Sequence, residues 1–234
     1  MHVITAENLT KTYRAGDVEV QAVRGVTFSV EPASFVSFVG PSGSGKSTLL
    51  NMIGCLDRPT SGKLTVLGTD VGTLGRKESA HFRGQNIGFI FQDFNLIPVL
   101  SVYENVEYPL IMVQSWPEHK RRDRVMELLA AVGMADQAQK RPDQISGGQK
   151  QRVAVARALA PETRLVLADE PTANLDSETA HRVIDLMRHL KDELGVTFAF
   201  STHDPKVMAE AEIIYHLEDG RVRDVEKMRE AACA

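Results

Sequence analysis

The sequence predicts an α/β fold with a mostly parallel sheet. Four short runs, "FVSFVG", "IGFIFQ", "LVLADE" and "VTFAFST", are apolar on both faces and are bounded by glycine or polar residues. Segments with apolar residues at helical spacing lie between these runs. Strands that are buried on both faces are typical of a parallel sheet with helices on each side. The first run also leads into a glycine-rich loop and then a helix, which is a common unit of α/β proteins.

Helices are expected at four places, each followed by a residue that ends helices. Apolar residues recur at helical spacing over residues 47–56, 117–132, 148–160 and 177–194. The residues that mark the ends of these segments are Pro59, Gly133, Pro161 and Gly195. In the first helix, the side chains predicted to lie in the core are Leu49, Leu50, Ile53 and Leu56.

Two further features define the organisation of the chain. The first thirty residues and the stretch "SGKLTVLGTDV" alternate between apolar and polar positions, as strands of an antiparallel edge layer do. Residues 93–160 are mainly helical by their pattern and contain no strong buried-strand run. We therefore expect a single domain over residues 1–234, in which a core of residues 1–92 and 161–234 carries a helical subdomain of residues 93–160.

Composition limits the possible classes of function. Apolar residues make up 43% of the 234 residues and charged residues 25%, which is typical of a soluble globular protein. The net charge is −4 with both signs spread along the chain, so no nucleic-acid partner is expected. The start lacks the pattern of a signal peptide, and no apolar run reaches the ~18 residues of a membrane span. Cys55 and Cys233 are far apart, so we expect inert thiols in a cytoplasmic protein, unless a partner holds the chain at a membrane.

The strongest chemical signal is "VGPSGSGKST". Residues 40–47 match G-x-x-x-x-G-K-[ST] and lie between a predicted buried strand and a predicted helix, the context of a P-loop. Glycines let backbone N–H groups converge on phosphate oxygens, and the helix start adds its positive end. We expect Lys46 to bridge the β- and γ-phosphates, Ser47 to bind Mg²⁺ and Thr48 to donate near the α-phosphate. The expected nucleotide-binding residues here are Gly40, Pro41, Ser42, Gly43, Ser44, Gly45, Lys46, Ser47 and Thr48.

Polar side chains that follow the other buried strands complete the predicted site. Asp169 and Glu170 follow "LVLA", where Asp169 can bind Mg²⁺ and Glu170 can act as general base for an attacking water. Gln92 ends "IGFIFQ", where its amide can reach the metal or the water. His203 follows the fourth strand and can donate to the γ-phosphate. Taken alone, each of these residues is explained at least as well by a structural role, as part of a solvated turn, a polar strand end or a packed histidine. Because a P-loop precedes them in the same chain, a role in nucleotide binding is the better interpretation.

Six motifs in this order resemble the motif set of the ATP-binding cassette (ABC) transporter ATPases: "GPSGSGKS", "FQ", "ISGGQ", "LVLADE", "TANLD" and "STHD". The resemblance extends from Val3 to about Val222 and implies a RecA-like P-loop NTPase core that hydrolyses ATP with Mg²⁺. The wording "IGFIFQDFNLIPVLSVYENVEYPL" resembles the lipoprotein-releasing and macrolide-exporting subgroup.

The resemblance also implies roles for single residues. Tyr13 is expected to stack on adenine, Gln92 is the Q-loop residue, Asp176 ends the D-loop and His203 is the switch histidine. Ile145 stands where the family usually has leucine before "SGGQ", a conservative apolar change. Together with the chemistry of these side chains, the resemblance implies that the ligands of Mg²⁺ are Ser47, Gln92 and Asp169.

The segment "QISGGQKQRVAVARALA" contains a second anion site at a helix start. A hydroxyl and unobstructed backbone N–H groups are offered here by Ser146, Gly147 and Gly148, which are followed by Gln149. N–H groups at a helix start bind anions for the same reason as those of the P-loop. In the family, two chains pack head to tail, so that this segment of one chain closes over the γ-phosphate held by the other. The resemblance therefore implies an ATP-dependent homodimer and a separate integral membrane permease, with the chain at the cytoplasmic face of the inner membrane.

Residues 93–113, "DFNLIPVLSVYENVEYPLIMV", are too apolar for an open loop and follow Gln92 directly. A short helix of the membrane partner is one explanation, and core packing of the helical subdomain is the other.

Other functions are also compatible with parts of the sequence. A regulatory cassette that drives cell-envelope signalling or division without moving a substrate carries the same motifs. Soluble ABC ATPases of translation or DNA repair usually join two cassettes or carry coiled-coil inserts, and this chain has neither. A P-loop kinase or GTPase is disfavoured because the guanine-reading N-K-x-D is missing and the "ISGGQ" segment would be unexplained.

Overall fold

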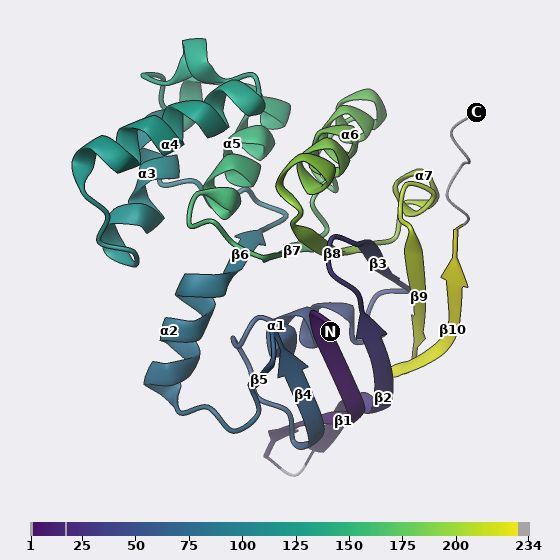
Figure 1. Ribbon diagram of the computed structural model, residues 1–234. Helices are drawn as coiled ribbons and strands as arrows, with labels where there is room; N and C mark the ends of the chain where they lie inside the picture. Colours follow the sequence, from purple (N-terminus) through teal and green to yellow (C-terminus); the bar gives the residue numbers. More distant parts are fainter. Residues whose placement is uncertain (1, 17, 229–234) are drawn as a thin grey trace.

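The computed structural model describes residues 2–16 and 18–228 and contains two β-sheets with helices around them (Figure 1). One sheet has the strand order β10-β9-β3-β8-β7-β6 and the other the order β2-β1-β4-β5. The predicted α/β class is therefore confirmed. Of the two cysteines, Cys55 is buried, and Cys233 lies outside the described residues.

The six-stranded sheet contains the four buried runs of the sequence as β3, β6, β7 and β8. Pairs β3–β8, β3–β9, β7–β8 and β6–β7 are parallel, and β9–β10 is antiparallel. All residues of β3 and β8 are buried, as expected of central strands covered on both faces. The strands are β3 (Phe35–Val39), β6 (Ile87–Ile90), β7 (Leu165–Asp169), β8 (Thr197–Thr202), β9 (Ile213–Glu218) and β10 (Arg221–Lys227).

The register of this sheet brings the carboxyl ends of its central strands to one edge. Val39 pairs with Thr202, and Asp169 pairs with Ser201. In parallel sheets, the loops that follow the strands emerge together at this edge, where α/β proteins bind their ligands. The residues that follow β3, β6, β7 and β8 are thereby collected in one place.

The second sheet is the antiparallel layer that the sequence predicts. Its strands are β1 (Ile4–Ala15), β2 (Val18–Val30), β4 (Ser61–Val66) and β5 (Thr69–Asp70). Helix α1 (Lys46–Ile53) contacts β7 and β8 of the large sheet and β2 of this layer. The centroid of the Phe28 ring lies 5.3 Å from that of Phe38 and 5.2 Å from that of Tyr215, so aromatic packing joins the two sheets.

Helix α1 is shorter than predicted. It ends at Ile53 because Cys55 has a left-handed φ of 55° and the N–H groups of Leu56 and Asp57 both donate to the Asn51 carbonyl. The prediction that Leu56 lies in the core is wrong, since 49% of this residue is exposed. The other predicted core residues of this helix are buried: Leu49, Leu50 and Ile53.

The remaining helices follow the predicted pattern with additions. The three later predicted helices are confirmed as α4 (Glu118–Ala131), α5 (Gly147–Leu159) and α6 (Ser177–Leu194), and Gly195 ends α6 with a φ of 64°. The additional elements are α2 (Arg76–Asn86), α3 (Val102–Met112), α7 (Pro205–Met208) and the 3₁₀ helices Ala135–Gln137 and Pro142–Gln144.

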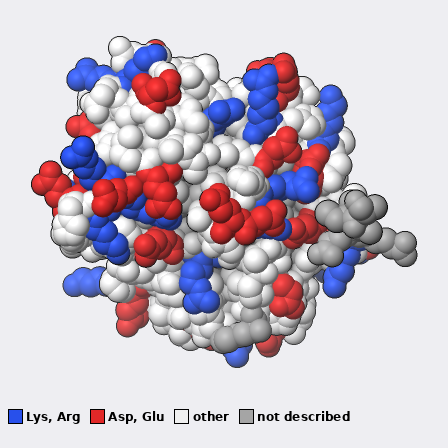
Figure 2. Space-filling view, turned by 45° about the horizontal axis from the view of Figure 1, so that its top comes forward, with Lys and Arg blue, Asp and Glu red and all other residues white. Residues whose placement is uncertain are grey.

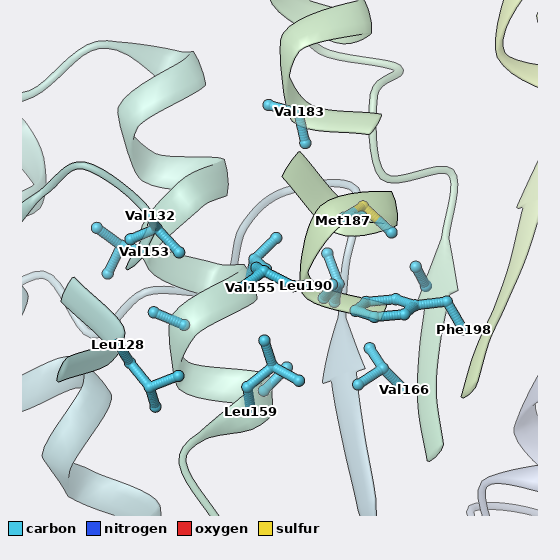
Figure 3. Close-up of a cluster of buried hydrophobic side chains, with 14 of the residues drawn as sticks. Leu128, Val132, Val153, Val155, Leu159, Val166, Val183, Met187, Leu190 and Phe198 are labelled. Atoms are coloured by element: carbon cyan, nitrogen blue, oxygen red, sulfur yellow. The ribbon is translucent and has the colours of Figure 1, made fainter. Parts of the chain in front are cut away.

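Residues 93–160 contain helices α3, α4 and α5, which lie together at one end of the molecule (Figure 1). Their hydrophobic packing continues into the large sheet (Figure 3). Leu128 of α4 and Leu159 of α5 belong to the same cluster as Val166 of β7 and Phe198 of β8. Helix α5 therefore joins the helical segment to the sheet, and the division into a core and a helical subdomain stays a prediction.

The surface carries charges of both signs. On the face in Figure 2, Lys and Arg are interspersed with Asp and Glu and form no continuous basic stripe. A basic stripe is the usual mark of a nucleic-acid surface. Over residues 2–16 and 18–228, none of the helices combines the length and the apolar character that crossing a bilayer requires.

Candidate nucleotide-binding site

The P-loop, residues 40–47, connects β3 to α1 in a conformation that needs its glycines. The φ angles of Gly40, Gly43 and Gly45 are 153°, 79° and 101°. A Cβ on Gly40 would lie 2.0 Å from the Leu217 carbonyl oxygen, and one on Gly45 would lie 2.4 Å from the Ala22 carbonyl oxygen. Both backbone shape and space therefore exclude side chains at these two positions.

A cavity of about 760 Å³ opens above this loop. It brings together the P-loop and three of the four predicted strand-end residues. The lining residues are Ala22, Pro41, Ser42, Gly43, Ser44, Gly45, Lys46, Ser47, Thr48, Gln92, Glu170, Ala173 and His203. The cavity thus collects residues from the ends of β3, β6, β7 and β8.

Two polar groups of the P-loop are arranged for an anion. Lys46 is 8% exposed, and its Nζ donates to the carbonyls of Gly40 (2.7 Å) and Pro41 (3.0 Å), which hold the ammonium beside the cavity. The hydroxyl of Ser44 is buried without a hydrogen-bond partner among the described residues. Because a buried hydroxyl normally has a partner, a phosphate oxygen in the cavity would supply the one that is missing.

Asp169, at the end of β7, lies beside the cavity and is held by two hydroxyls. Ser47 donates to Asp169 Oδ1 over 3.0 Å, and Ser201 donates to the same oxygen over 2.6 Å. Ser201 Oγ also accepts the Glu170 N–H at 2.9 Å. Ser201 was not predicted from the sequence, although a polar residue within the apolar run of β8 was a visible signal.

Glu170 and His203 meet across the ends of β7 and β8. His203 Nδ1 lies 3.0 Å from both carboxylate oxygens of Glu170. Glu170 has a left-handed φ of 48°, an uncommon conformation for a residue with a side chain, and strain of this kind is found mostly at functional sites. The Glu170 side chain is 18% exposed and that of His203 is 70% exposed, so the pair lies at the cavity mouth.

Gln92 lines the cavity directly after β6, and its backbone is tied to the segment after β7. The side-chain amide of Asn174 donates to the Gln92 carbonyl over 3.0 Å and to Asp93 Oδ1 over 2.9 Å. Asn174, in "TANLD", was not singled out from the sequence. It links the loops that follow β6 and β7.

The second predicted anion site opens helix α5. Ser146 is its N-cap: the Ser146 hydroxyl accepts the Gln149 N–H (3.3 Å), and Gln149 Oε1 accepts the Ser146 N–H (2.9 Å). This capping box leaves the N–H groups of Gly147 and Gly148 at an open helix start. Residues 146–149 do not contribute to the cavity lining above the P-loop. Within one chain, the predicted anion site at residues 146–149 is separate from the P-loop cavity.

Asp176 caps helix α6 by accepting the Thr179 N–H at 3.0 Å, and the hydrogen bonds from Thr179 lower the pKa of its carboxyl. Tyr13, on β1, does not line the cavity. The residue is 41% exposed, and its hydroxyl lies close to Thr48 of helix α1 and donates to Asp57. Tyr13 therefore lies outside the cavity lining, next to helix α1.

Comparison with known proteins identifies the family. A family model described as ABC transporter matches residues 23–173. An uncharacterized ABC transporter ATP-binding protein of Thermotoga maritima is 45% identical over 225 residues, which are 96% of this chain and 95% of that protein. The chain belongs to the ABC transporter family. It is an ATP-binding subunit with the ATPase activity of that family, as the sequence predicts.

Other relatives of this ABC subunit include solved structures and longer proteins. A dimeric structure of the ATP-binding cassette MJ0796, described as a post-hydrolysis state bound to ADP and Pi, has a TM-score of 0.88 at 43% identity and covers 97% of this chain and 99% of that one. Cassette cbiO1 from Clostridium perfringens has a TM-score of 0.87 at 28% identity, covering 97% of this chain and 88% of that one.

One group of relatives is much longer than this chain. The macrolide export ATP-binding/permease protein MacB of Syntrophobacter fumaroxidans is 44% identical over 94% of this chain, but the match covers only 31% of that protein.

Proposed function

We propose that ATP joins two copies of this chain head to tail, and that the closing and opening of this homodimer drives a separate membrane subunit. The observation that carries the proposal is the separation of two anion sites within one chain: the P-loop cavity contains Lys46, and residues 146–149 lie outside its lining. A second copy turned head to tail supplies the missing half of each site. The dimeric structure described for cassette MJ0796 supports pairing of two such chains.

The P-loop residues bind the phosphates in the proposed site. Lys46 contacts the β- and γ-phosphates, and Thr48 donates near the α-phosphate. Mg²⁺ supplies positive charge against the phosphate oxygens when it is bound. Ser47 and Asp169 are its proposed ligands, with Gln92 reaching the metal or its water, because the oxygens of Ser47 and Asp169 already lie 3.0 Å apart and hard oxygen donors suit this ion.

Hydrolysis in this proposal depends on Glu170 and His203. Glu170 accepts a proton from a water whose oxygen attacks the γ-phosphorus. As the new P–O bond forms, the bond from the γ-phosphorus to the bridging oxygen breaks and ADP leaves with that oxygen. His203 contacts Glu170 through Nδ1 at 3.0 Å, which leaves Nε2 to donate to a γ-phosphate oxygen when the imidazole is protonated. Ser201 holds the Glu170 N–H and so supports the left-handed backbone that aims this carboxylate.

The partner copy contributes residues 146–149 to the same γ-phosphate. The open N–H groups at the start of α5, with the Ser146 hydroxyl, form an anion site that favours the charge of the phosphate. Asp176, at the start of α6, is the proposed D-loop contact across the dimer. A ligand shifts an equilibrium only by its different affinity for the two states. ATP contacts both copies only in the closed dimer, so it stabilises closure, and loss of the γ-phosphate favours opening.

The membrane subunit is proposed to contact the groove beside α3. A cavity of about 360 Å³ lies there, lined by residues of α2, β6, α3 and α5 and of the segments that follow them, including Phe89, Phe91, Tyr108 and Val113. Apolar side chains close to these residues in the sequence are exposed, including Val99 (73%) and Met112 (62%). A short apolar helix of a partner would cover them. Phe91 and Asn95, which line the groove, flank Gln92 in the sequence, so movement of the partner reaches the ATP site through this segment.

The most specific form of this proposal is export or lipoprotein release at the cytoplasmic face of the cell membrane. The MacB relatives support it, because they are named as exporters that hold ATP-binding and permease parts in one protein. The alternative is a regulatory cassette that drives envelope signalling or division without moving a substrate.

Purification of the chain from detergent-solubilised native membranes tests the proposal. We expect an integral membrane protein to copurify in a fixed ratio, and its identity distinguishes an exporter from a signalling partner. Recovery of the chain without any integral membrane protein, under conditions that keep its ATPase activity, would contradict it.

A further inference from the structure

The Tyr13 side chain forms a network with the side chains of Lys11 and Asp57. The Tyr13 hydroxyl donates to Asp57 Oδ2 over 2.7 Å. Lys11 Nζ donates to Asp57 Oδ1 over 2.5 Å and to the Arg58 carbonyl over 2.8 Å. The Arg58 N–H donates to the same Asp57 carboxylate over 2.7 Å. The Asp57 carboxylate thus accepts three hydrogen bonds, from the Tyr13 hydroxyl, the Lys11 ammonium and the Arg58 N–H.

Lys11 also covers one side of the ring. Its ammonium lies 4.8 Å from the centroid of the Tyr13 ring, a distance typical of a cation–π contact. The Lys11 side chain is only 12% exposed, so it is held in place and does not move freely in water. One face of the Tyr13 ring is therefore occupied, while the residue as a whole remains 41% exposed.

The network is anchored to the phosphate-binding helix. The Asp57 N–H donates to the carbonyl of Asn51, a residue of α1, over 3.2 Å. Helix α1 begins with Lys46 and also carries Thr48, whose side chain approaches the Tyr13 hydroxyl. The turn after α1 thus links the position of the Tyr13 ring to the position of the P-loop.

The charges in the network are arranged to persist at neutral pH. Burial alone would raise the pKa of the Asp57 carboxyl, but hydrogen bonds from Lys11, Tyr13 and the Arg58 N–H lower the pKa below its ordinary value. Burial, followed by the hydrogen bond to Asp57, raises the pKa of the Tyr13 phenol. The carboxylate stays charged, and the phenol keeps the proton that it donates.

We propose that Asp57 and Lys11 are positioning residues that hold Tyr13 as a one-sided stacking platform for the nucleobase of ATP. This inference rests on the proposed ATP-binding function and on the role at adenine that the resemblance to the family implies for Tyr13. Asp57 fixes the direction of the ring, and Lys11 covers one face, so that the base stacks on the other. A ring held in advance loses less freedom on binding, which strengthens binding of the base. The base, and not the phosphate chain, stacks on this ring, so we expect the network to strengthen binding of the base selectively.

The test compares a nucleotide with a ligand that has no base. Calorimetry on the full chain measures binding of ADP and of inorganic tripolyphosphate, each with Mg²⁺. For Asp57→Ala we expect the Kd for ADP to rise about fivefold, while the Kd for tripolyphosphate and kcat at saturating ATP stay within about twofold. Lys11→Met should weaken ADP in the same selective way, and Asp57→Asn, which keeps a hydrogen-bond acceptor for Tyr13, should restore part of the affinity.

Two further variants distinguish the positioning role of Asp57 from the role of Tyr13 on which it depends. In Tyr13→Phe the hydroxyl is missing, so adding Asp57→Ala should reduce the affinity for ADP by a smaller factor than it does in the unaltered chain. Tyr13→Ala should weaken ADP and leave tripolyphosphate unchanged. If Tyr13→Ala has no effect on ADP, the role of Tyr13 itself is wrong. If it weakens ADP but Asp57→Ala does not, only the positioning role is overturned.

Glu19→Ala is the matched control. It breaks the 2.7 Å ion pair with Arg14 on the same hairpin without touching Tyr13, and it should leave both affinities unchanged. An equal loss of ADP and tripolyphosphate binding in Asp57→Ala would show that Asp57 supports the P-loop instead of the ring, and would overturn the inference.

Discussion

The methyl group of Thr179 occupies the space in front of Gly148. A Cβ on Gly148 would lie 2.3 Å from Thr179 Cγ2, so the starts of helices α5 and α6 are in close contact. A Cβ on Gly147 would meet nothing nearer than Leu175 Cδ2, at 3.5 Å. A side chain at position 148 therefore disturbs its own chain before it reaches a partner, whereas position 147 accepts one.

This difference defines a test of the head-to-tail dimer. Lys46→Ala removes the cation of the P-loop, and Gly147→Asp places a carboxylate against the partner's γ-phosphate. Each homodimer should be inactive. In a mixed dimer both defects fall in one site, and the other site is normal. Random pairing makes about half of the dimers mixed, so ATPase activity should recover to about a quarter of normal if the two sites act independently.

Gly147→Ala is the control for this mixture, because it adds a side chain without a charge and should retain most of its activity. If exchange of subunits is verified by a fluorescent label and the mixture still hydrolyses no ATP, residues 146–149 act within their own chain. That result would contradict the proposed arrangement.

Glu170→Gln should separate ATP binding from hydrolysis. The amide keeps the shape of the side chain but cannot accept a proton from water, so kcat should fall about 10²-fold or more. Because ATP is not consumed, light scattering should detect an accumulated dimer after ATP is added. Lys46→Ala, which loses phosphate binding, should form no such dimer. A Glu170→Gln protein with normal turnover would show that another group is the base.

Ser201→Ala should reduce catalysis while sparing nucleotide binding. The change removes one of two hydroxyl donors to Asp169 and leaves the Glu170 N–H without its acceptor, a loss worth about 1–3 kcal/mol. We expect kcat to fall about tenfold, with a Kd for metal-free ATP within about twofold. Ser37→Ala is a matched control, because its buried hydroxyl in β3 has no partner among the described residues. Equal effects of both changes on kcat would mean that Ser201 has only a packing role.

Val99→Asp should weaken assembly with the membrane subunit and leave ATP binding intact. Val99 is 73% exposed in the segment between Gln92 and α3, so a charge there costs the isolated chain little. Leu96 is a less selective target, because it packs against the hydrophobic core and a charge there destabilises the fold. Val225→Asp, at another exposed apolar position on β10, is the control for copurification. Unchanged copurification of Val99→Asp would place the interface elsewhere.

Local and periodic features of the chain were sufficient to predict much of the site. The P-loop was predictable because strand, glycines and helix follow one another directly, and positive φ angles at Gly43 and Gly45 are what those glycines permit. Gln92 and His203 were predictable because each follows a buried run, and parallel strands bring their ends to one edge. The apolar character of residues 93–113 was also visible, but not its division between the buried Val106 and the exposed Val99.

Only the tertiary structure determined which residues distant in the sequence meet around these motifs. Ser201 contacts Asp169 across 32 positions of sequence, and Asp57 contacts Tyr13 across 44. The close approach of Thr179 to Gly148, which leaves no room for a Cβ, likewise involves two helix starts that no repeat or spacing connects. Sequence periodicity reports which face of an element is buried, whereas these contacts depend on how strands register and helices cross, so they became visible only when the chain was folded.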